Sequence, residues 1–240
     1  MAFTGRRVLI TGGGRGLGYE IAKQFDIVGA TIIILDKEVE LLNSIKSQHP
    51  KWTMIQCDLL DWEGTKSALE HLEPCDHVVN NAGVNFRQDF LDITPEKIDF
   101  IFGVNYKSIV NISQIMSKKM IASKIPGTIV HISSYASYVQ LPSISVYSAS
   151  KAAVVNLTKH MSAELGPHKI RVNCVCPTYM ITDFTKDYIE KNPERFEKIL
   201  DKQNFKEFVD PVDVGKLVVF LSGDGAKMIN GSKVKIDGGC

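Results

Sequence analysis

Short apolar runs, most of them four to six residues long, recur along the chain. Continuous runs of this length are typical of strands that are buried on both faces, as in a parallel sheet. We therefore expect strands at residues 8–11, 31–35, 52–57, 77–80, 128–133, 170–175 and 232–236.

The segments between these runs carry helical spacing. Residues 19–29 place Ile21, Phe25 and Val28 on one stripe and reach a helix stop signal at their final glycine. Residues 38–50 show the same spacing and end at a proline. This alternation predicts an α/β fold, with a doubly wound (Rossmann-type) parallel sheet and helices on both faces.

The composition agrees with this picture. The chain has 240 residues, of which 44% are hydrophobic and 23% are charged, as in an ordinary soluble globular protein. No repeat or linker divides it, so we expect a single domain over residues 1–240. The net charge of +1 predicts no nucleic-acid partner, and no apolar run approaches the roughly 20 residues that a membrane span needs.

The cysteines bear on the compartment. No pair has Cys-x-x-Cys spacing, and residues 1–7 lack the apolar core of a signal peptide. We therefore expect reduced thiols in a cytoplasmic protein. The five cysteines are Cys57, Cys75, Cys174, Cys176 and Cys240.

A glycine-rich turn follows the first predicted strand. Gly12, Gly16 and Gly18 form G-x-x-x-G-x-G, which is neither the usual dinucleotide spacing nor a P-loop. A strand, a glycine turn and a helix N-terminus together make a site for phosphate, although a simple tight turn is an alternative. Asp36, at the end of the second strand, favours the phosphate site because a carboxylate there can bind the ribose of a dinucleotide.

Further motifs complete a pattern. The chain carries T-G-x-x-x-G-x-G at residues 11–18, N-N-A-G at 80–83, a serine at 134 and Tyr-x-x-x-Lys at 147–151. In this order they resemble the short-chain dehydrogenase/reductase family, and the resemblance covers essentially the whole chain. Within that family, the scaffold segments GRRVLITG, DLLDWE and LGPHKIRVN resemble the L-xylulose (dicarbonyl) and carbonyl reductases.

The spacing of Tyr147 and Lys151 places both side chains on one face of a helix. A nearby ammonium favours the phenolate, so we expect Lys151 to lower the pKa of Tyr147 and make it a general acid–base. The resemblance implies that Ser134 binds the substrate oxygen and that Asn105 holds a proton-relaying water. Strand alternation should point Ser133 the other way. The alternative is that Tyr147 only packs and Lys151 is solvated.

The resemblance also implies the cofactor contacts. Asp58 would face the adenine, Asn81 to Gly83 the adenosine ribose, Pro177 and Thr178 the carboxamide, and Thr182 the pyrophosphate. The full implied set is Gly12, Arg15, Gly16, Leu17, Gly18, Asp36, Lys37, Asp58, Leu59, Asn81, Ala82, Gly83, Tyr147, Lys151, Pro177, Thr178 and Thr182.

The choice between NAD and NADP depends on three charged residues. Asp36 would repel the extra phosphate of NADP, which favours NAD. Arg15 and Lys37 occupy positions where NADP-using relatives carry basic residues, so NADP stays possible. Alternatively, these two cations pair with Asp36 or reach solvent.

The predicted substrate is a small carbonyl compound or alcohol, bound by Ser134 and Tyr147. Residues 135–146, including Tyr138, should form an apolar pocket wall, and residues 183–208 form either a broken helical lid or a solvated helix pair. No cluster has metal-ligand spacing, so no metal is expected. A sensor or scaffold that binds NAD(P) without turnover is the alternative function.

The resemblance further implies a homotetramer. One interface would use the outer faces of two helices, at residues 104–120 and 148–165, and the C-terminal residues 235–240 would support a second. The outer residues expected on the second helix are Ala152, Val155, Thr158 and Met161.

Overall fold

The computed structural model describes residues 3–182 and 185–240 and contains one seven-stranded parallel sheet. The strand order is β3-β2-β1-β4-β5-β6-β7, which confirms the doubly wound fold class. All of the expected strands are present, with bounds within two residues of the apolar runs. They are β1 (Arg7–Thr11), β2 (Thr31–Asp36), β3 (Thr53–Gln56), β4 (His77–Asn80), β5 (Gly127–Ile132), β6 (Ile170–Pro177) and β7 (Lys233–Ile236).

Helices follow most of the strands. A π-helical turn, η2 (Gly103–Lys107), joins α4 to α5, and short 3₁₀ turns lie at 90–92, 135–137, 166–168 and 224–226. The α-helices are α1 (Gly16–Ile27), α2 (Val39–Gln48), α3 (Trp62–Leu69), α4 (Pro95–Phe102), α5 (Ser108–Ala122), α6 (Ser145–Leu165), α7 (Lys186–Lys191), α8 (Pro193–Leu200) and α9 (Pro211–Ser222). None of the helices in the described part of the chain has the length and apolarity to cross a bilayer.

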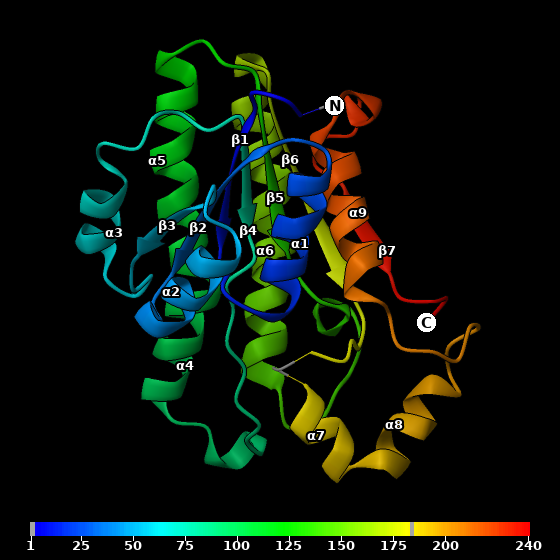
Figure 1. Ribbon diagram of the computed structural model, residues 1–240. Helices are drawn as coiled ribbons and strands as arrows, with labels where there is room; N and C mark the ends of the chain where they lie inside the picture. Colours follow the sequence, from blue (N-terminus) through cyan, green and yellow to red (C-terminus); the bar gives the residue numbers. More distant parts are fainter. Residues whose placement is uncertain (1–2, 183–184) are drawn as a thin grey trace.

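Side chains alternate across the central strands and build two hydrophobic cores. Val8 and Ile10 of β1 pack with α1, α2 and α9, whereas Leu9 packs with α3, α5 and α6 on the other face. Figure 1 shows α1 and α9 side by side on the first of these faces. The continuous apolar runs are therefore explained, because both faces of the central strands are covered.

The two edge strands differ from the expectation. β3 and β7 were expected to be buried on both faces, but their side chains are partly or fully exposed. Each has a single neighbouring strand, so less of it is covered.

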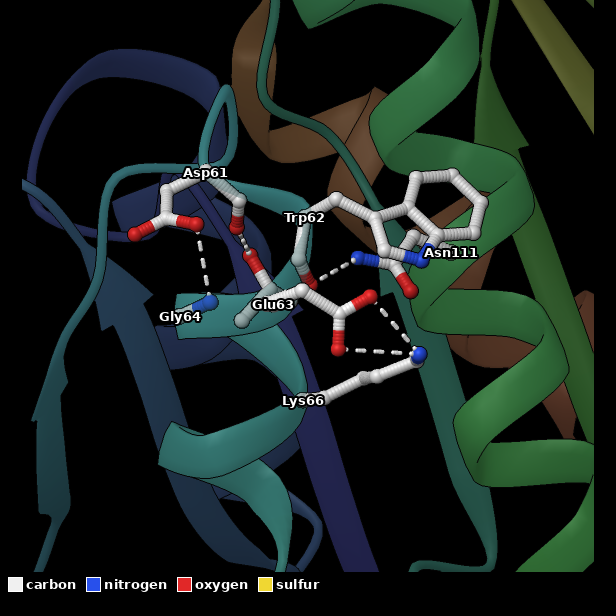
Figure 2. Close-up of polar contacts among 7 residues, drawn as sticks. Asp61, Trp62, Glu63, Gly64, Lys66 and Asn111 are labelled. Carbon is white, nitrogen blue, oxygen red and sulfur yellow. Dashed lines mark hydrogen bonds and ion pairs between the residues drawn. The ribbon is translucent and has the colours of Figure 1, made fainter.

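Helix α3 follows the segment that carries Asp58, and its start is held in place on two sides (Figure 2). The Asp61 side chain accepts a hydrogen bond from the backbone N–H of Gly64 at 2.8 Å and so caps the helix. Asn111 of α5 donates to the backbone oxygen of Trp62 at 2.9 Å. The cap and this long-range bond fix the start of α3 against α5.

Helix α6 corrects one expected interface residue. Thr158 is fully buried, and its hydroxyl donates to the Val154 backbone oxygen at 2.8 Å, so it belongs to the core. Ala152 is exposed, and Val155 and Met161 are half-buried. The outer face of α6 is thus narrower than predicted.

The strand order reverses between β1 and β4, and in folds of this class ligands bind at the carboxyl ends of the strands near such a reversal. Figure 1 shows α7 and α8 beyond one end of the sheet, after the last residues of β6. The glycine turn, the loop after β4 and these two helices therefore surround the carboxyl ends of the central strands.

Candidate active site

A cavity of about 590 Å³ lies at the carboxyl ends of these strands. The residues implied for the cofactor, from Gly12 to Thr182, all line it, and so do Ser134, Tyr147 and Lys151. Asn105 lies behind the wall rather than in it. The fold has brought together segments of the chain that are more than 130 residues apart in the sequence.

The glycine turn has a steric reason for its composition. Gly12 and Gly16 adopt left-handed φ values of +61° and +54°, which favour glycine. A Cβ atom on Gly18 would lie 2.1 Å from the backbone oxygen of Gly12, so α1 can approach the turn only because this position has no side chain. The first turn of α1 has no side-chain cap from Arg15, which leaves its N-terminal end open toward the cavity.

Thr11 and Asn81 tie the glycine turn to the loop after β4. The Thr11 hydroxyl accepts hydrogen bonds from the backbone N–H groups of Asn81 and Ala82, both at 3.1 Å. The Asn81 amide donates to the backbone oxygens of Thr11 and Gly12 at 3.1 and 3.0 Å. The side chain of Asn81 thus holds the two loops together, while the residue still borders the cavity.

The acidic end of the cavity is built around Asp36 at the end of β2. Its carboxylate accepts from the backbone N–H groups of Gly14 at 3.1 Å and Glu38 at 3.3 Å. The ion pair considered between Arg15 and Asp36 does not form, because Arg15 pairs with Glu38 at 3.0 Å instead. Lys37 is exposed at the cavity rim.

The opposite wall carries the remaining implied contacts. Asp58 is exposed, and its Oδ1 accepts from the Leu60 backbone N–H at 3.0 Å. The Thr178 hydroxyl is buried and has no hydrogen-bond partner among the described residues. A Cβ on Gly16 would lie 3.7 Å from the Cβ of Thr182, so the segment after β6 faces the glycine turn. An open helix end on one side and an unpartnered hydroxyl on the other fit a bound dinucleotide.

Tyr147 and Ser134 meet at the inner end of the cavity. Desolvation raises the pKa of Tyr147 above its usual value, and a hydrogen bond with Ser134 opposes that rise. Ser134 lies just beyond β5, and its Oγ accepts from the Ala136 backbone N–H at 3.1 Å. As expected from strand alternation, Ser133 points away and donates to the backbone oxygen of Lys151 at 2.9 Å.

Lys151 is 3% exposed and donates to the Ile132 backbone oxygen at 2.8 Å. Burial lowers its pKa to about 8. The expected lowering of the Tyr147 pKa by this ammonium is wrong for the protein alone, because desolvation dominates at the phenol. The Lys151 Nζ lies 5.8 Å from the centre of the Tyr147 ring, so the two groups share one site without an ion pair.

Asn105 lies in the π-helical turn and is fully buried. Its amide donates to the Val84 backbone oxygen at 2.9 Å and to Ser150 Oγ at 3.0 Å, and its Oδ1 accepts from the Val84 N–H at 2.8 Å. Both amide protons are in use, so the side chain acts as a clamp between the loop after β4 and α6.

Sequence reasoning misplaced one residue of this site and missed others. Tyr138 points away from the cavity and donates to Asp237 at 3.0 Å. Five further side chains line the substrate end, from the loop after β4, the segment after β6, α7 and α8. The position of the first loop after a strand pointed to two of them, and the expected lid at residues 183–208 contains two others. The five are Asn85, Arg87, Tyr179, Tyr188 and Phe196. Residues 183–184 of the expected lid lie outside the described residues.

Comparison with known proteins gives one consistent result. Residues 6–193 match the short chain dehydrogenase family. Carbonyl reductase [NADPH] 2 of Sus scrofa is 38% identical and L-xylulose reductase of Bos taurus 39% identical, each over 100% of this chain and 98% of the relative.

A solved structure agrees in fold. L-sorbose reductase from Gluconobacter frateurii, complexed with NADPH and L-sorbose, superposes with a TM-score of 0.90 at 26% identity and covers 100% of this chain and 97% of its own. The match to the family extends over the glycine turn, the loop after β4 and the helix that carries Tyr147 and Lys151. The chain therefore belongs to the short chain dehydrogenase family and is an oxidoreductase.

Proposed function

We propose that this protein interconverts a small carbonyl compound and its secondary alcohol, with Tyr147 as the general acid–base. The observation that carries the proposal is the meeting of Tyr147, Ser134 and Lys151 at the inner end of a cavity whose other end is the glycine turn. A dinucleotide that extends from that turn would bring its nicotinamide next to the phenol. The relatives named for L-xylulose and carbonyl reduction support a carbonyl substrate.

Each residue has a distinct task in this proposal. A nicotinamide held in the cavity would supply the hydride in reduction and accept it in oxidation. Ser134 donates a hydrogen bond to the substrate oxygen, and Tyr147 donates a proton to it during reduction. Desolvation keeps Tyr147 protonated at neutral pH, which is the form that reduction requires. Lys151, whose pKa is about 8, replaces the proton and binds the nicotinamide ribose.

Asn105 has a positioning role in the same proposal. Through Val84 and Ser150 it fixes the loop after β4 against the helix that carries Tyr147 and Lys151. A Cβ on Gly83 would lie 3.3 Å from Lys151 Nζ and 3.4 Å from Asn105 Oδ1. A relay water bound at this turn would donate to Asn105 Oδ1 or bind a backbone group, since both amide protons are committed.

We infer that NAD is the preferred cofactor and that NADP binds more weakly. Asp36 is held by two backbone N–H groups with its charge at the end of β2, where the adenosine ribose would lie. Glu38 neutralises Arg15, so the charge of Asp36 is not offset by that cation. The names of the pig relative and of the L-sorbose reductase complex, which both include NADPH, favour the other cofactor, so the two must be compared directly.

We further propose a homotetramer in the cytoplasm. The exposed Ala152 and the half-buried Val155 support an interface along α6, which covers the same face of the sheet as α5, whereas Met161 packs partly against the core. All five cysteines are free, which agrees with a reducing compartment. Light scattering should give the mass of four chains at micromolar concentration, and a monomer would contradict the proposal.

The proposed reaction is tested by NADH oxidation with diacetyl, a quinone and a ketose, each repeated with NADPH. We expect turnover with at least one of these carbonyl compounds. Cofactor binding without turnover across the panel would favour a sensor and would overturn the proposal.

A further inference from the structure

The loop after β4, residues 84–89, is fixed at both ends to residues that lie next to, or bond to, the helix that carries Tyr147. At its start, Val84 exchanges two hydrogen bonds with the Asn105 amide. At its end, the Gln88 backbone N–H donates to the Ser143 backbone oxygen at 2.8 Å, and Ser143 Oγ donates to Asp89 at 3.0 Å. Ser143 precedes α6 by two residues, so both anchors lead to the helix that carries Tyr147. A side chain in the middle of this loop is therefore held at a fixed place in the cavity wall.

Arg87 is that side chain, and it lines the cavity. Its guanidinium carbon lies 3.7 Å from the centre of the Tyr188 ring, so the cation stacks on an aromatic residue of α7. The stacking fixes the guanidinium from one side, while the loop fixes the backbone. The plane of the five N–H donors is thus set in advance.

One nitrogen of the Arg87 guanidinium also lacks a hydrogen-bond acceptor. Its Nη1 atom is buried and has no hydrogen-bond partner among residues 3–182 and 185–240, and no ion pair within these ranges includes Arg87. The Oδ1 atom of Asn85, two residues earlier, is also buried and unpartnered within the same ranges. Buried polar groups are nearly always satisfied, so unsatisfied ones in a cavity wall indicate a ligand that completes them.

The charges around the cavity point to the kind of ligand. Arg15, Asp36, Lys37 and Glu38 belong to the glycine turn and the end of β2, and Asp58 follows β3. At the substrate end, Lys151 already donates to a backbone oxygen. The neighbouring walls are apolar, with Phe100, Val104, Leu141 and Ile144. Arg87 is thus a cation with a buried, unpartnered nitrogen in a wall that holds these apolar side chains and the Asn85 amide.

We propose that Arg87 binds the carboxylate of the substrate, so that the enzyme acts on oxo-carboxylates and, in reverse, on hydroxy-carboxylates. This inference rests on the proposed function and specifies its substrate class. In reduction, the hydride adds to the carbonyl carbon, the proton of Tyr147 goes to the carbonyl oxygen, and the carboxylate is unchanged. A carboxylate matches the fork of a guanidinium, and Asn85 Oδ1 accepts from a substrate hydroxyl group.

The test compares matched substrates that differ in charge. Acetoacetate and levulinate are each assayed against their methyl esters, with the full-length protein saturated in NADH. The two chain lengths sample the distance between the carbonyl carbon and Arg87. We expect kcat/KM to be at least about tenfold greater for one of the anions than for its ester, the size of a charged hydrogen bond.

Variants assign the effect to Arg87. Arg87→Met keeps an apolar stem on Tyr188 and should raise KM for the preferred anion about 10- to 100-fold while leaving the ester within threefold. Arg87→Lys keeps the charge without the forked geometry, so its KM for the preferred anion should lie between those of the wild type and Arg87→Met. The matched control is Lys97→Met, because Lys97 lies 4.0 Å from the Phe86 ring but does not line the cavity. The Lys97→Met change should alter the KM of neither the anion nor the ester.

Two outcomes would overturn the proposal while leaving the proposed function standing. One is that the anions and esters react equally well in the wild-type protein. The other is that Arg87→Met lowers activity on both equally, which would mean that Arg87 only supports Tyr188. If no carbonyl compound reacts at all, including diacetyl, then the proposed function itself fails. Thermal unfolding of each variant identifies one that has simply lost its fold.

Discussion

The two ends of the cavity differ in how complete they are. At the cofactor end, the loops are joined by the hydrogen bonds of Thr11 and Asn81, and the charges of Arg15 and Glu38 are paired. At the substrate end, buried atoms of Arg87 and Asn85 have no partner among the described residues. The protein has thus joined the loops of the cofactor end through its own hydrogen bonds and leaves the Thr178 hydroxyl there for a ligand, whereas at the substrate end a guanidinium and an amide need a ligand to satisfy them.

This difference separates recognition of the phosphate, which many proteins share, from recognition of the substrate, which is particular to one protein. A phosphate can be recognised by glycine geometry and backbone N–H groups, which many sequences can supply. A substrate must be recognised by side chains at fixed positions, and a loop clamped at both ends provides such a position. Four changes test this contrast, the first two at the substrate end and the last two at the cofactor end.

The largest effect is expected from Tyr147→Phe. This change keeps the ring but removes the transferable proton, so turnover should fall by at least about a hundredfold, the low end for general acid–base catalysis. Binding of NADH, measured by fluorescence, should remain because the cofactor end is untouched. Tyr138→Phe is the control, since its hydroxyl contacts Asp237 outside the cavity. Near-normal turnover in Tyr147→Phe would rule out the mechanism.

The buried Lys151 predicts a pH effect on stability. Its pKa is lowered from 10.5 to about 8, so between these values the unfolded chain binds the proton and the folded protein does not. Stability therefore rises with pH across this window, by up to about 3 kcal/mol, because a cost that is present below pH 8 is relieved.

Lys151→Met provides the reference for this measurement, because it removes the titrating group. In urea unfolding at several pH values, the free energy of unfolding of the wild type should increase relative to that of the variant as pH rises from 8 to 10.5. A constant difference between the two curves would mean that Lys151 is not desolvated in the folded protein.

Asp36→Thr is expected to change the cofactor preference. In the parent, kcat/KM should be greater with NADH than with NADPH. Removing the negative charge should shift the ratio roughly ten- to a hundredfold toward NADPH, about 1.4 to 2.8 kcal/mol, at fixed ionic strength. A parent that already prefers NADPH would contradict the choice of NAD. No change in the variant would show that Asp36 does not face the ribose.

The smallest effect is expected from Glu38→Gln. This substitution frees Arg15 from an ion pair whose side chains are 59% and 40% exposed, and such pairs are worth at most about 1 kcal/mol. The cofactor ratio should move toward NADPH by less than about fivefold. If Arg15 binds the phosphate, the double variant with Asp36→Thr should shift the free energy of cofactor preference by more than the sum of the two single shifts. Simple addition would mean that Arg15 remains in solvent.

The sequence alone was sufficient for the strands, the glycine turn and the Tyr-x-x-x-Lys helix. These features depend on a few neighbouring residues: the length of an apolar run, the missing side chain at Gly12 and Gly18, and a spacing of four on a helix. A feature set by local backbone geometry can be read from local sequence, and for this reason the predicted strand bounds agree within two residues.

Only the tertiary structure decided which side chains meet. Arg15 pairs with Glu38, Tyr138 points to Asp237, and Thr158 lies in the core, because each of these outcomes depends on elements that pack from elsewhere in the chain. The rise in the Tyr147 pKa likewise depends on how much water the assembled cavity excludes. The stacking of Arg87 on Tyr188 joins residues 101 positions apart, and no local pattern encodes a contact over that distance.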